Sequence, residues 1–165
     1  MGAIVGVDGC LMLVVNGDWK AVPQTDRSIK SWLIDLAFDI DLPIHFAEIA
    51  MNNGSSVGNG LAQIVALNPD GKRKRLLLAG SHLEDAVTFE CLEALAYGFD
   101  VFLPSDLIEV SDFNFVSLHW DRLKQAGAVP TTITQMLNEW SVCATDAAII
   151  EKIRLRSQEF RKIHK

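Results

Sequence analysis

Cysteine is scarce in this sequence, and its spacing argues against two kinds of site. The chain of 165 residues has three cysteines, an odd number, and no Cys-x-x-Cys pair, which disfavours both a disulfide framework and a metal centre. A basic segment followed by a cleavable apolar stretch, as in a secretory signal, is also missing. We therefore expect a cytoplasmic protein with reduced thiols, no metal and no cofactor.

Long apolar runs and an excess of positive charge are missing as well. Hydrophobic residues make up 49% of the chain and the mean hydropathy is +0.19, yet no run reaches the roughly 18 residues of a membrane span. The formal net charge of −6 argues against a nucleic-acid binder, which would carry a basic surface. We expect neither membrane nor nucleic acid as a partner, and we expect the apolar surplus to fill a wide core and a subunit interface.

Continuous apolar runs alternate with helical patterns along the chain. Strands are predicted at residues 11–15, 42–50, 75–80, 101–104 and 128–132. Helices are predicted at 27–39, 84–97, 114–126, 133–142 and 145–163, with a short helix or irregular segment at 61–68 and a glycine-rich loop at 51–60. Such alternation implies right-handed crossovers and a mostly parallel sheet. The prediction is one domain over residues 1–165, a three-layer α/β/α sandwich with a Rossmann-like sheet.

Two segments carry the most specific patterns: GKRKRLLLAGSHLEDAVTFECLEALAYGFDVFLPSD at 71–106 and HWDRLKQAGAVPTTITQMLNEW at 119–140. In their order and spacing they resemble the isochorismatase-like cysteine hydrolases, a family that includes nicotinamidases. The resemblance implies a homo-oligomer, a dimer or larger, and a site built from an Asp after the first strand, a Lys after a long loop and a Cys at the start of a helix. In that mechanism the Asp takes the thiol proton and the Cys attacks a carbonyl.

The family's three catalytic positions are substituted or unmatched in this chain. The nucleophile corresponds to Ala86, which has no reactive atom. The Asp corresponds to Asn16 in LMLVVNGD, with Asp18 two residues further on, whereas an alternative alignment through AIVGVD places Asp8 there. The only lysines after the 51–60 loop and before Gly80 lie too close to the predicted strand to match.

The turn before Ala86 retains one feature that the resemblance implies. The family's oxyanion hole uses the backbone N–H of the nucleophile and that of the residue four positions earlier, which are Ala86 and His82 here, with Ser81–His82 as the candidate cis peptide. His82 paired with Glu84 or Asp85 would make a base, but no serine or cysteine is evidently placed for it to activate. A helix-capping or pocket-wall histidine is the simpler interpretation.

The apolar side of the helix predicted at 84–97 is expected to face the core. Its members are Val87, Phe89, Cys91, Leu92 and Leu95. Because Cys91 lies on this side, about one and a half turns beyond Ala86, we expect it to be a buried core thiol rather than a displaced nucleophile.

Three functions of different classes remain open. The first is a family member inactive in the cysteine-hydrolase sense, retained for oligomeric assembly or for binding a small ligand. The second is an active hydrolase of a small amide, ester or vinyl ether that uses Asp8 or Asp18 with His82; isochorismatases themselves cleave a vinyl ether without a cysteine, so Ala86 alone does not decide. The third is a pure interaction protein, with Trp120 and Trp140 either at its interface or, as ordinary core residues, inside the fold.

Overall fold

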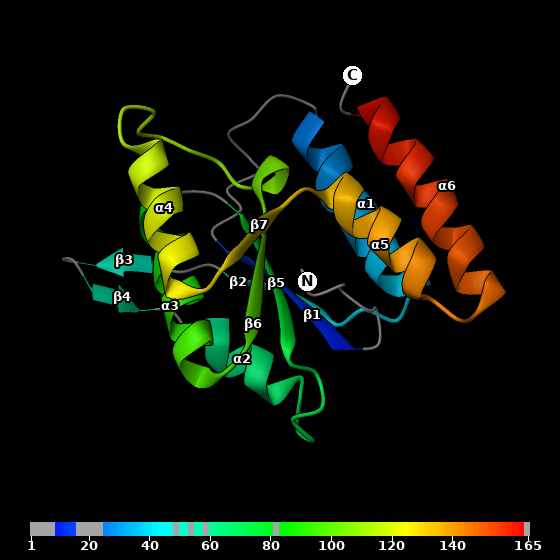
Figure 1. The fold of residues 1–165 in the computed structure, drawn as a ribbon, viewed down its shortest axis with the longest axis horizontal. Helices are drawn as coiled ribbons and strands as arrows, with labels where there is room; N and C mark the ends of the chain where they lie inside the picture. The colour runs from blue at the N-terminus through cyan, green and yellow to red at the C-terminus, as the bar shows by residue number, and fades with distance from the viewer. Residues whose placement is uncertain are drawn as a thin grey trace.

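A parallel five-stranded sheet lies at the centre of the fold (Figure 1). The computed structural model describes residues 9–15, 25–47, 50–52, 55–57, 60–80 and 83–163. The strands of this sheet are β2 (Ile44–Ala47), β1 (Cys10–Val15), β5 (Arg75–Gly80), β6 (Asp100–Pro104) and β7 (Val129–Thr131), in that spatial order. Each neighbouring pair is parallel, as the alternation of strands and helices predicts.

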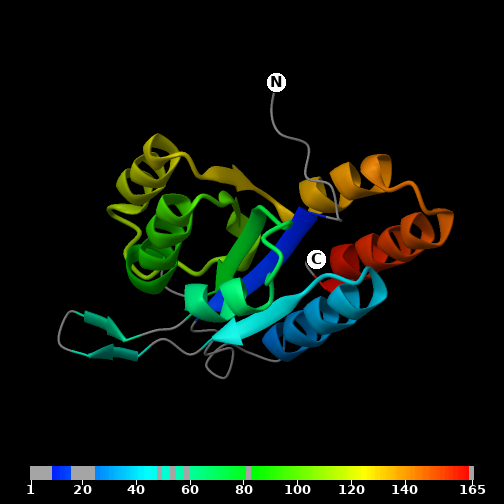
Figure 2. The same ribbon diagram turned by 90° about the horizontal axis from the view of Figure 1, so that it is seen from below.

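Helices cover both faces of the sheet (Figure 2). One face carries α1 (Thr25–Asp39), α5 (Ile133–Cys143) and α6 (Ala147–Ile163). The other carries α2 (Gly60–Ala66), α3 (Thr88–Tyr97) and α4 (Val116–Ala126). The predicted three-layer α/β/α architecture is confirmed.

The central strands explain why two helical layers form. All six residues of β1 are buried, and successive side chains of a strand point to opposite faces of its sheet. Met12 and Val14 accordingly belong to the apolar cluster on the α1 side, whereas Leu11 and Leu13 belong to the cluster on the α3 side. A strand that is apolar at every position needs a cover on both faces.

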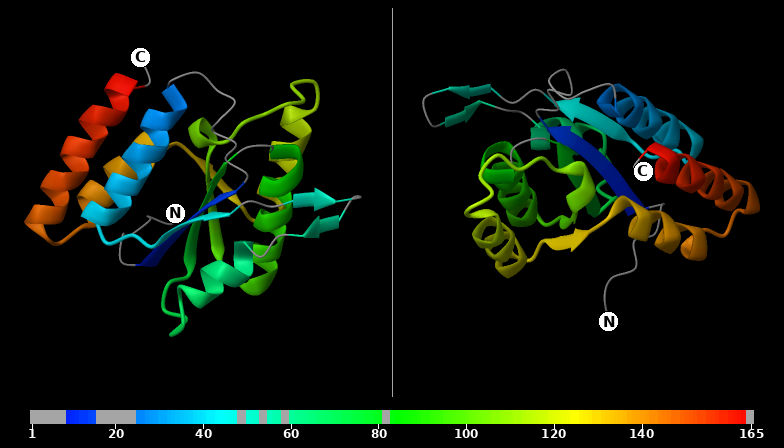
Figure 3. Two further views of the ribbon diagram at one scale, coloured as in Figure 1. Left: turned by 180° about the vertical axis from the view of Figure 1, so that it is seen from behind. Right: turned by 90° about the horizontal axis from the view of Figure 1, so that it is seen from above.

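A β-hairpin replaces the loop predicted at 51–60, and that prediction is wrong. Strands β3 (Ala50–Asn52) and β4 (Ser55–Val57) pair antiparallel as a separate two-stranded sheet, visible beside the main sheet in Figure 3. The dipeptide between them in the sequence is Asn-Gly, the favoured connection of two-residue hairpins. The glycine and serine content of this stretch obscured that local pattern.

The C-terminal helix α6 is held against α1 by an aromatic contact between Trp32 and Phe160. The ring centroids of Trp32 and Phe160 lie 4.7 Å apart. The indole N–H of Trp32 donates a hydrogen bond of 3.0 Å to the carbonyl oxygen of Arg156. Since the backbone of α6 itself accepts this bond, the contact fixes the position of the helix as well as its side chains.

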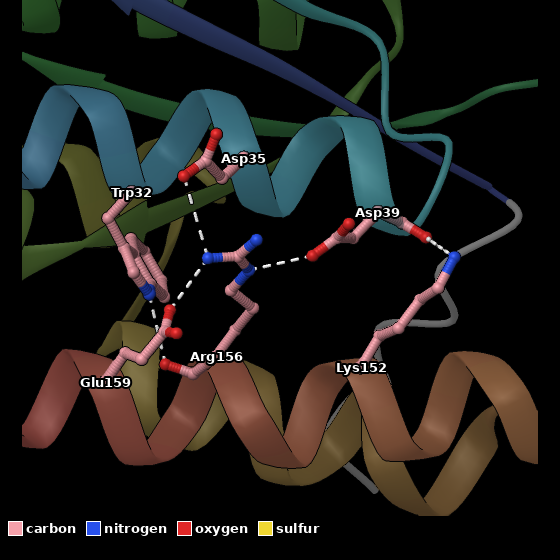
Figure 4. Close-up of polar contacts among 6 residues, drawn as sticks. All are labelled: Trp32, Asp35, Asp39, Lys152, Arg156 and Glu159. Atoms are coloured by element: carbon pink, nitrogen blue, oxygen red, sulfur yellow. Dashed lines mark hydrogen bonds and ion pairs between the residues drawn. The ribbon is translucent and has the colours of Figure 1, made fainter.

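Charged groups extend the same contact (Figure 4). The Nε of Arg156 lies 2.8 Å from a carboxylate oxygen of Asp39, and one of its terminal nitrogens lies 2.8 Å from Glu159 and 3.6 Å from Asp35. Lys152 donates to the carbonyl oxygen of Asp39 at 3.2 Å, close to the end of α1. Arg156 is therefore fully engaged in joining α6 to α1.

None of the helices in the described ranges is both long enough and apolar enough to cross a membrane.

Candidate functional site

The carboxyl ends of β1 and β5 meet at the edge of the sheet where open parallel α/β folds bind their ligands. Val15, the last residue of β1, is in register with Gly80, the last residue of β5. Gly80 has a φ of 132°, and a Cβ at this position would lie 1.9 Å from the carbonyl oxygen of Val15. Only glycine permits this approach of the two strands.

A π-helical turn, Leu83–Val87, follows at this edge and leads directly into α3. The hydroxyl of Thr88 donates to the carbonyl oxygen of Leu83, five residues earlier, which matches the wide spacing of a π turn. The N–H of Leu83 donates to the carbonyl oxygen of Glu109, whose own N–H donates to the carbonyl oxygen of Gly80, both at 3.0 Å. The turn is thus anchored to the segment that follows β6.

Ala86 lies inside this turn and is fully buried. It belongs to the apolar cluster that also contains Val15 and Leu83. A methyl group in such surroundings offers neither a nucleophile nor a proton donor.

The burial predicted for the helix at 84–97 needs one correction. Phe89, expected to be buried, is 37% exposed, whereas Val87 is fully buried. From Val87 onward the spacing is that of a regular α-helix: Val87, Cys91 and Ala94 share the buried side, and Phe89, two positions after Val87, lies on the opposite side.

Glu84 is the acidic group of the turn, and its carboxylate is occupied. It accepts the backbone N–H groups of Ser111 and Asp112 at 2.9 and 2.7 Å, and the hydroxyl of Ser111 at 3.2 Å. Burial tends to raise the pKa of Glu84, but these hydrogen bonds outweigh burial and the pKa is lowered. Glu84 is therefore an ionised brace between the turn and the 111–112 segment. Asp85, the other candidate partner for His82, is exposed.

A second acidic residue, Glu90 of α3, was missed by the sequence reasoning. It is fully buried, and its Oε2 accepts the backbone N–H of Leu61 at 3.0 Å, while Oε1 has no hydrogen-bond partner among the described residues. A Cβ on Gly60 would lie 2.8 Å from Oε2, so glycine leaves room for the carboxyl group. Burial raises the pKa of Glu90 to about 7, with a further contribution from the charge of Glu93. One feature of the sequence could have indicated this buried position: Glu90 lies four residues before Ala94, and thus on the same side of the helix, which faces the core.

None of the three cysteines lies in the π-helical turn that contains Ala86. Cys91 is fully buried, and burial raises the pKa of its thiol to about 12, so the thiol is neutral at physiological pH. The prediction of a core thiol is confirmed. Cys10 is the first residue of β1 and thus lies at the opposite edge of the sheet from Ala86, and Cys143 is the last residue of α5 on the other face.

The remaining residues of the predicted site lie outside the described ranges. These are Asp8, Asn16, Asp18, Ser81 and His82. Their roles, and the geometry of the Ser81–His82 peptide, stay predictions. Within the described ranges, no three His, Cys, Asp or Glu residues are grouped closely enough to hold a metal ion.

The chain is similar to proteins described as hydrolases. A stretch of 67 residues is 43% identical to the probable hydrolase YcaC of Escherichia coli, covering 39% of this chain and 31% of YcaC, so the chain matches less than a third of that relative's length. No protein-family model matches the chain.

Solved structures extend the likeness over nearly the whole chain. The MAR1 ribonuclease of Caenorhabditis elegans superposes with a TM-score of 0.70 at 16% identity, covering 93% of this chain and 92% of its own. The YcaC structure from E. coli, described as an octameric hydrolase of unknown specificity, gives 0.61 at 21% identity, covering 99% and 98%. An isochorismatase-like hydrolase from Alkaliphilus metalliredigens gives 0.54 at 13% identity, covering 79% and 98%. The resemblance to isochorismatase-like hydrolases is confirmed, and the chain shares their fold.

Proposed function

We propose that this chain, which has the fold of the isochorismatase-like hydrolases, does not perform their cysteine chemistry and is retained for oligomeric assembly, with small-ligand binding as a further role. The observation that carries the proposal is Ala86. Where the resemblance places the attacking sulfur, the chain has a fully buried methyl group inside the π-helical turn. Covalent acyl transfer needs a nucleophilic atom within reach of the carbonyl, and this position supplies none.

The first strand supports the same proposal. Strand β1 ends at Val15, so the residue that follows it in the sequence is Asn16, whereas Asp8 precedes the strand. A neutral amide does not accept a proton from a thiol or from water, as a general base must. The bounds of β1 support the alignment that assigns the family's Asp to Asn16, in which a second catalytic group is replaced.

Assembly is supported by apolar side chains on the surface. Phe38, Phe113 and Val142 are 88%, 77% and 81% exposed, and covering such side chains with a second copy would remove apolar surface from water. The similar YcaC of E. coli is described as an octamer. The proposed partner is a second copy of this chain. A cytoplasmic location fits the lack of a disulfide among the cysteines of the described residues, because disulfides are uncommon in that compartment.

The test is a substrate panel combined with sedimentation. The full chain is incubated with an amide (nicotinamide), an ester (p-nitrophenyl acetate), the vinyl ether isochorismate, and single-stranded RNA, the last because the similar MAR1 is described as a ribonuclease. We expect no turnover above the uncatalysed rate and a sedimenting species larger than the monomer. The contrary result is turnover of one of these substrates that is abolished by Asp8→Ala or Asp18→Ala and preserved in the surface control Asp121→Ala. That result would establish an active hydrolase instead.

A further inference from the structure

A groove of about 200 Å³ lies between α5 and α6, which run side by side in Figures 1 and 2. Its floor is apolar: Leu137 of α5 and Ile153 of α6 are each 1% exposed and belong to the cluster on the α1 side of the sheet. Ala86 belongs to the cluster on the opposite side. The α5–α6 groove is therefore separate from the edge of the sheet at which the turn with Ala86 lies. Binding in this groove does not depend on the proposed function.

Polar side chains form one wall of the α5–α6 groove. Arg154, Ser157, Gln158 and Arg161 of α6 all line it. Residues three and four apart on a helix are neighbours on its surface, so these four make a continuous stripe with the arginines at its ends. The two arginines are two turns apart, about 10 Å along the axis. Ser157 lies between them, within the reach of both long side chains.

The two groove arginines differ from the arginine between them in sequence. Arg156 points towards α1 and is engaged by Asp39 and Glu159 (Figure 4). Within the described part of the chain, neither Arg154 nor Arg161 has a hydrogen-bond or ion-pair partner, and both are exposed. The chain as a whole has a net charge of −6, whereas this groove carries two guanidinium groups without an anionic partner among the described residues.

We propose that the α5–α6 groove binds a small phosphate monoester. Arg154 and Arg161 approach the phosphoryl group from its two sides, because guanidinium groups form paired, charge-assisted hydrogen bonds with phosphate oxygens. The hydroxyl of Ser157 and the carboxamide of Gln158 add donors between them. The organic part of the ligand lies on the apolar floor formed by Leu137 and Ile153.

One polar group of the groove takes no donor role in this proposal. The hydroxyl of Ser141, on the α5 side, donates to the carbonyl oxygen of Asn138 at 2.7 Å. Its proton is therefore already used within α5. The predicted recognition comes from α6 alone, and substitutions in α6 are the informative ones.

The test is calorimetric titration of the full chain, at low salt, with phenyl phosphate, inorganic phosphate and phenol. Arg154→Gln and Arg161→Gln are each expected to weaken phenyl phosphate binding about tenfold or more, the loss expected for a charged hydrogen-bonding group. The matched control is Arg122→Gln on the exposed surface of α4, which removes the same charge on the other face and should change affinity less than twofold. Thermal unfolding of each variant verifies that it remains folded.

Three outcomes would overturn the proposal. The first is no binding of phenyl phosphate to the wild-type chain. The second is an equal loss in Arg122→Gln, which would show that only net charge matters. The third is inorganic phosphate or phenol binding as tightly as phenyl phosphate, because the proposed site requires both the phosphoryl group and the apolar floor.

Discussion

Glu90 of α3 and Leu61 of α2 are joined by a hydrogen bond of 3.0 Å from the backbone N–H of Leu61 to the Glu90 carboxyl group. The carboxyl group is fully buried, and its second oxygen has no hydrogen-bond partner in the part of the chain that the structure describes. A buried acidic group is tolerated most easily when it is protonated, because burial penalises the charged form. The pKa of about 7 places the change of charge within the physiological range.

We expect the stability of the protein to fall as the pH rises from 5 to 8. The Glu90 carboxyl titrates near 4.5 in the unfolded chain and near 7 in the folded protein. Between these values the folded state holds a proton that the unfolded state has released, so the free energy of unfolding decreases with pH. Urea unfolding should show wild type losing up to roughly 3 kcal/mol more than Glu90→Gln over this range.

The control for this prediction is Glu151→Gln, which changes an exposed residue of α6. It should keep the pH dependence of the wild type. The opposing outcome is that Glu90→Gln shows the same pH dependence of stability as wild type and Glu151→Gln. In that case the Glu90 carboxyl group has the same pKa in the folded and unfolded states, and the interpretation of Glu90 is wrong.

Gly80→Ala should destabilise the fold more than any other glycine substitution with a positive φ among the described residues. The new Cβ would lie 1.9 Å from the carbonyl oxygen of Val15, so β1 and β5 would have to separate. Gly98→Ala is the matched control, because Gly98 has a φ of 97° and no atom within 4 Å of the added Cβ. We expect a loss of more than about 3 kcal/mol for Gly80→Ala and about 1 kcal/mol for Gly98→Ala, measured by urea unfolding. Equal losses would show that backbone strain alone, and not the strand contact, makes glycine necessary.

Arg156→Gln should destabilise the protein by about 1–2 kcal/mol, because it removes the bonds to Asp39 and Glu159 and leaves their carboxylates unpaired. Burial tends to lower the pKa of Arg156, but the hydrogen bonds to Asp39 and Glu159 outweigh it and the pKa is raised. Arg154→Gln, two residues away and unpaired, should change the free energy of unfolding by less than about 0.5 kcal/mol. The difference should shrink in high salt; two equal changes would contradict the role of Arg156 in joining α6 to α1.

The sequence was sufficient to predict the main sheet and its covering helices. Strand β1 is apolar at every position, and β5 is buried at all but its first residue, a pattern that specifies a central parallel strand without ambiguity. The hairpin at β3 and β4 was missed because each strand has only three residues and their composition is that of a loop. A local dipeptide preference was the only available indication.

The site was less accessible to sequence reasoning for a different physical reason. Cys91 could be assigned to the core because its neighbours in the helical pattern are apolar. Phe89 was misassigned because it is apolar, although it lies two positions from both Val87 and Cys91 and therefore on the opposite side of a regular helix. Glu90 owes its importance to Leu61 and Gly60, which lie about thirty residues away in the chain and are brought to it only by the packing of α2 on α3.

The absence of a nucleophile at Ala86 can be tested most directly by intact-protein mass spectrometry after incubation with p-nitrophenyl acetate. An enzyme with a cysteine nucleophile passes through an acylated state. We predict no rapid acylation of Cys91 in the folded chain, because the thiol is buried and has a pKa of about 12, and reaction of Cys91 only after unfolding. A single acetyl group that appears on Cys91 within the time of one turnover, and is then lost by hydrolysis, would contradict the account.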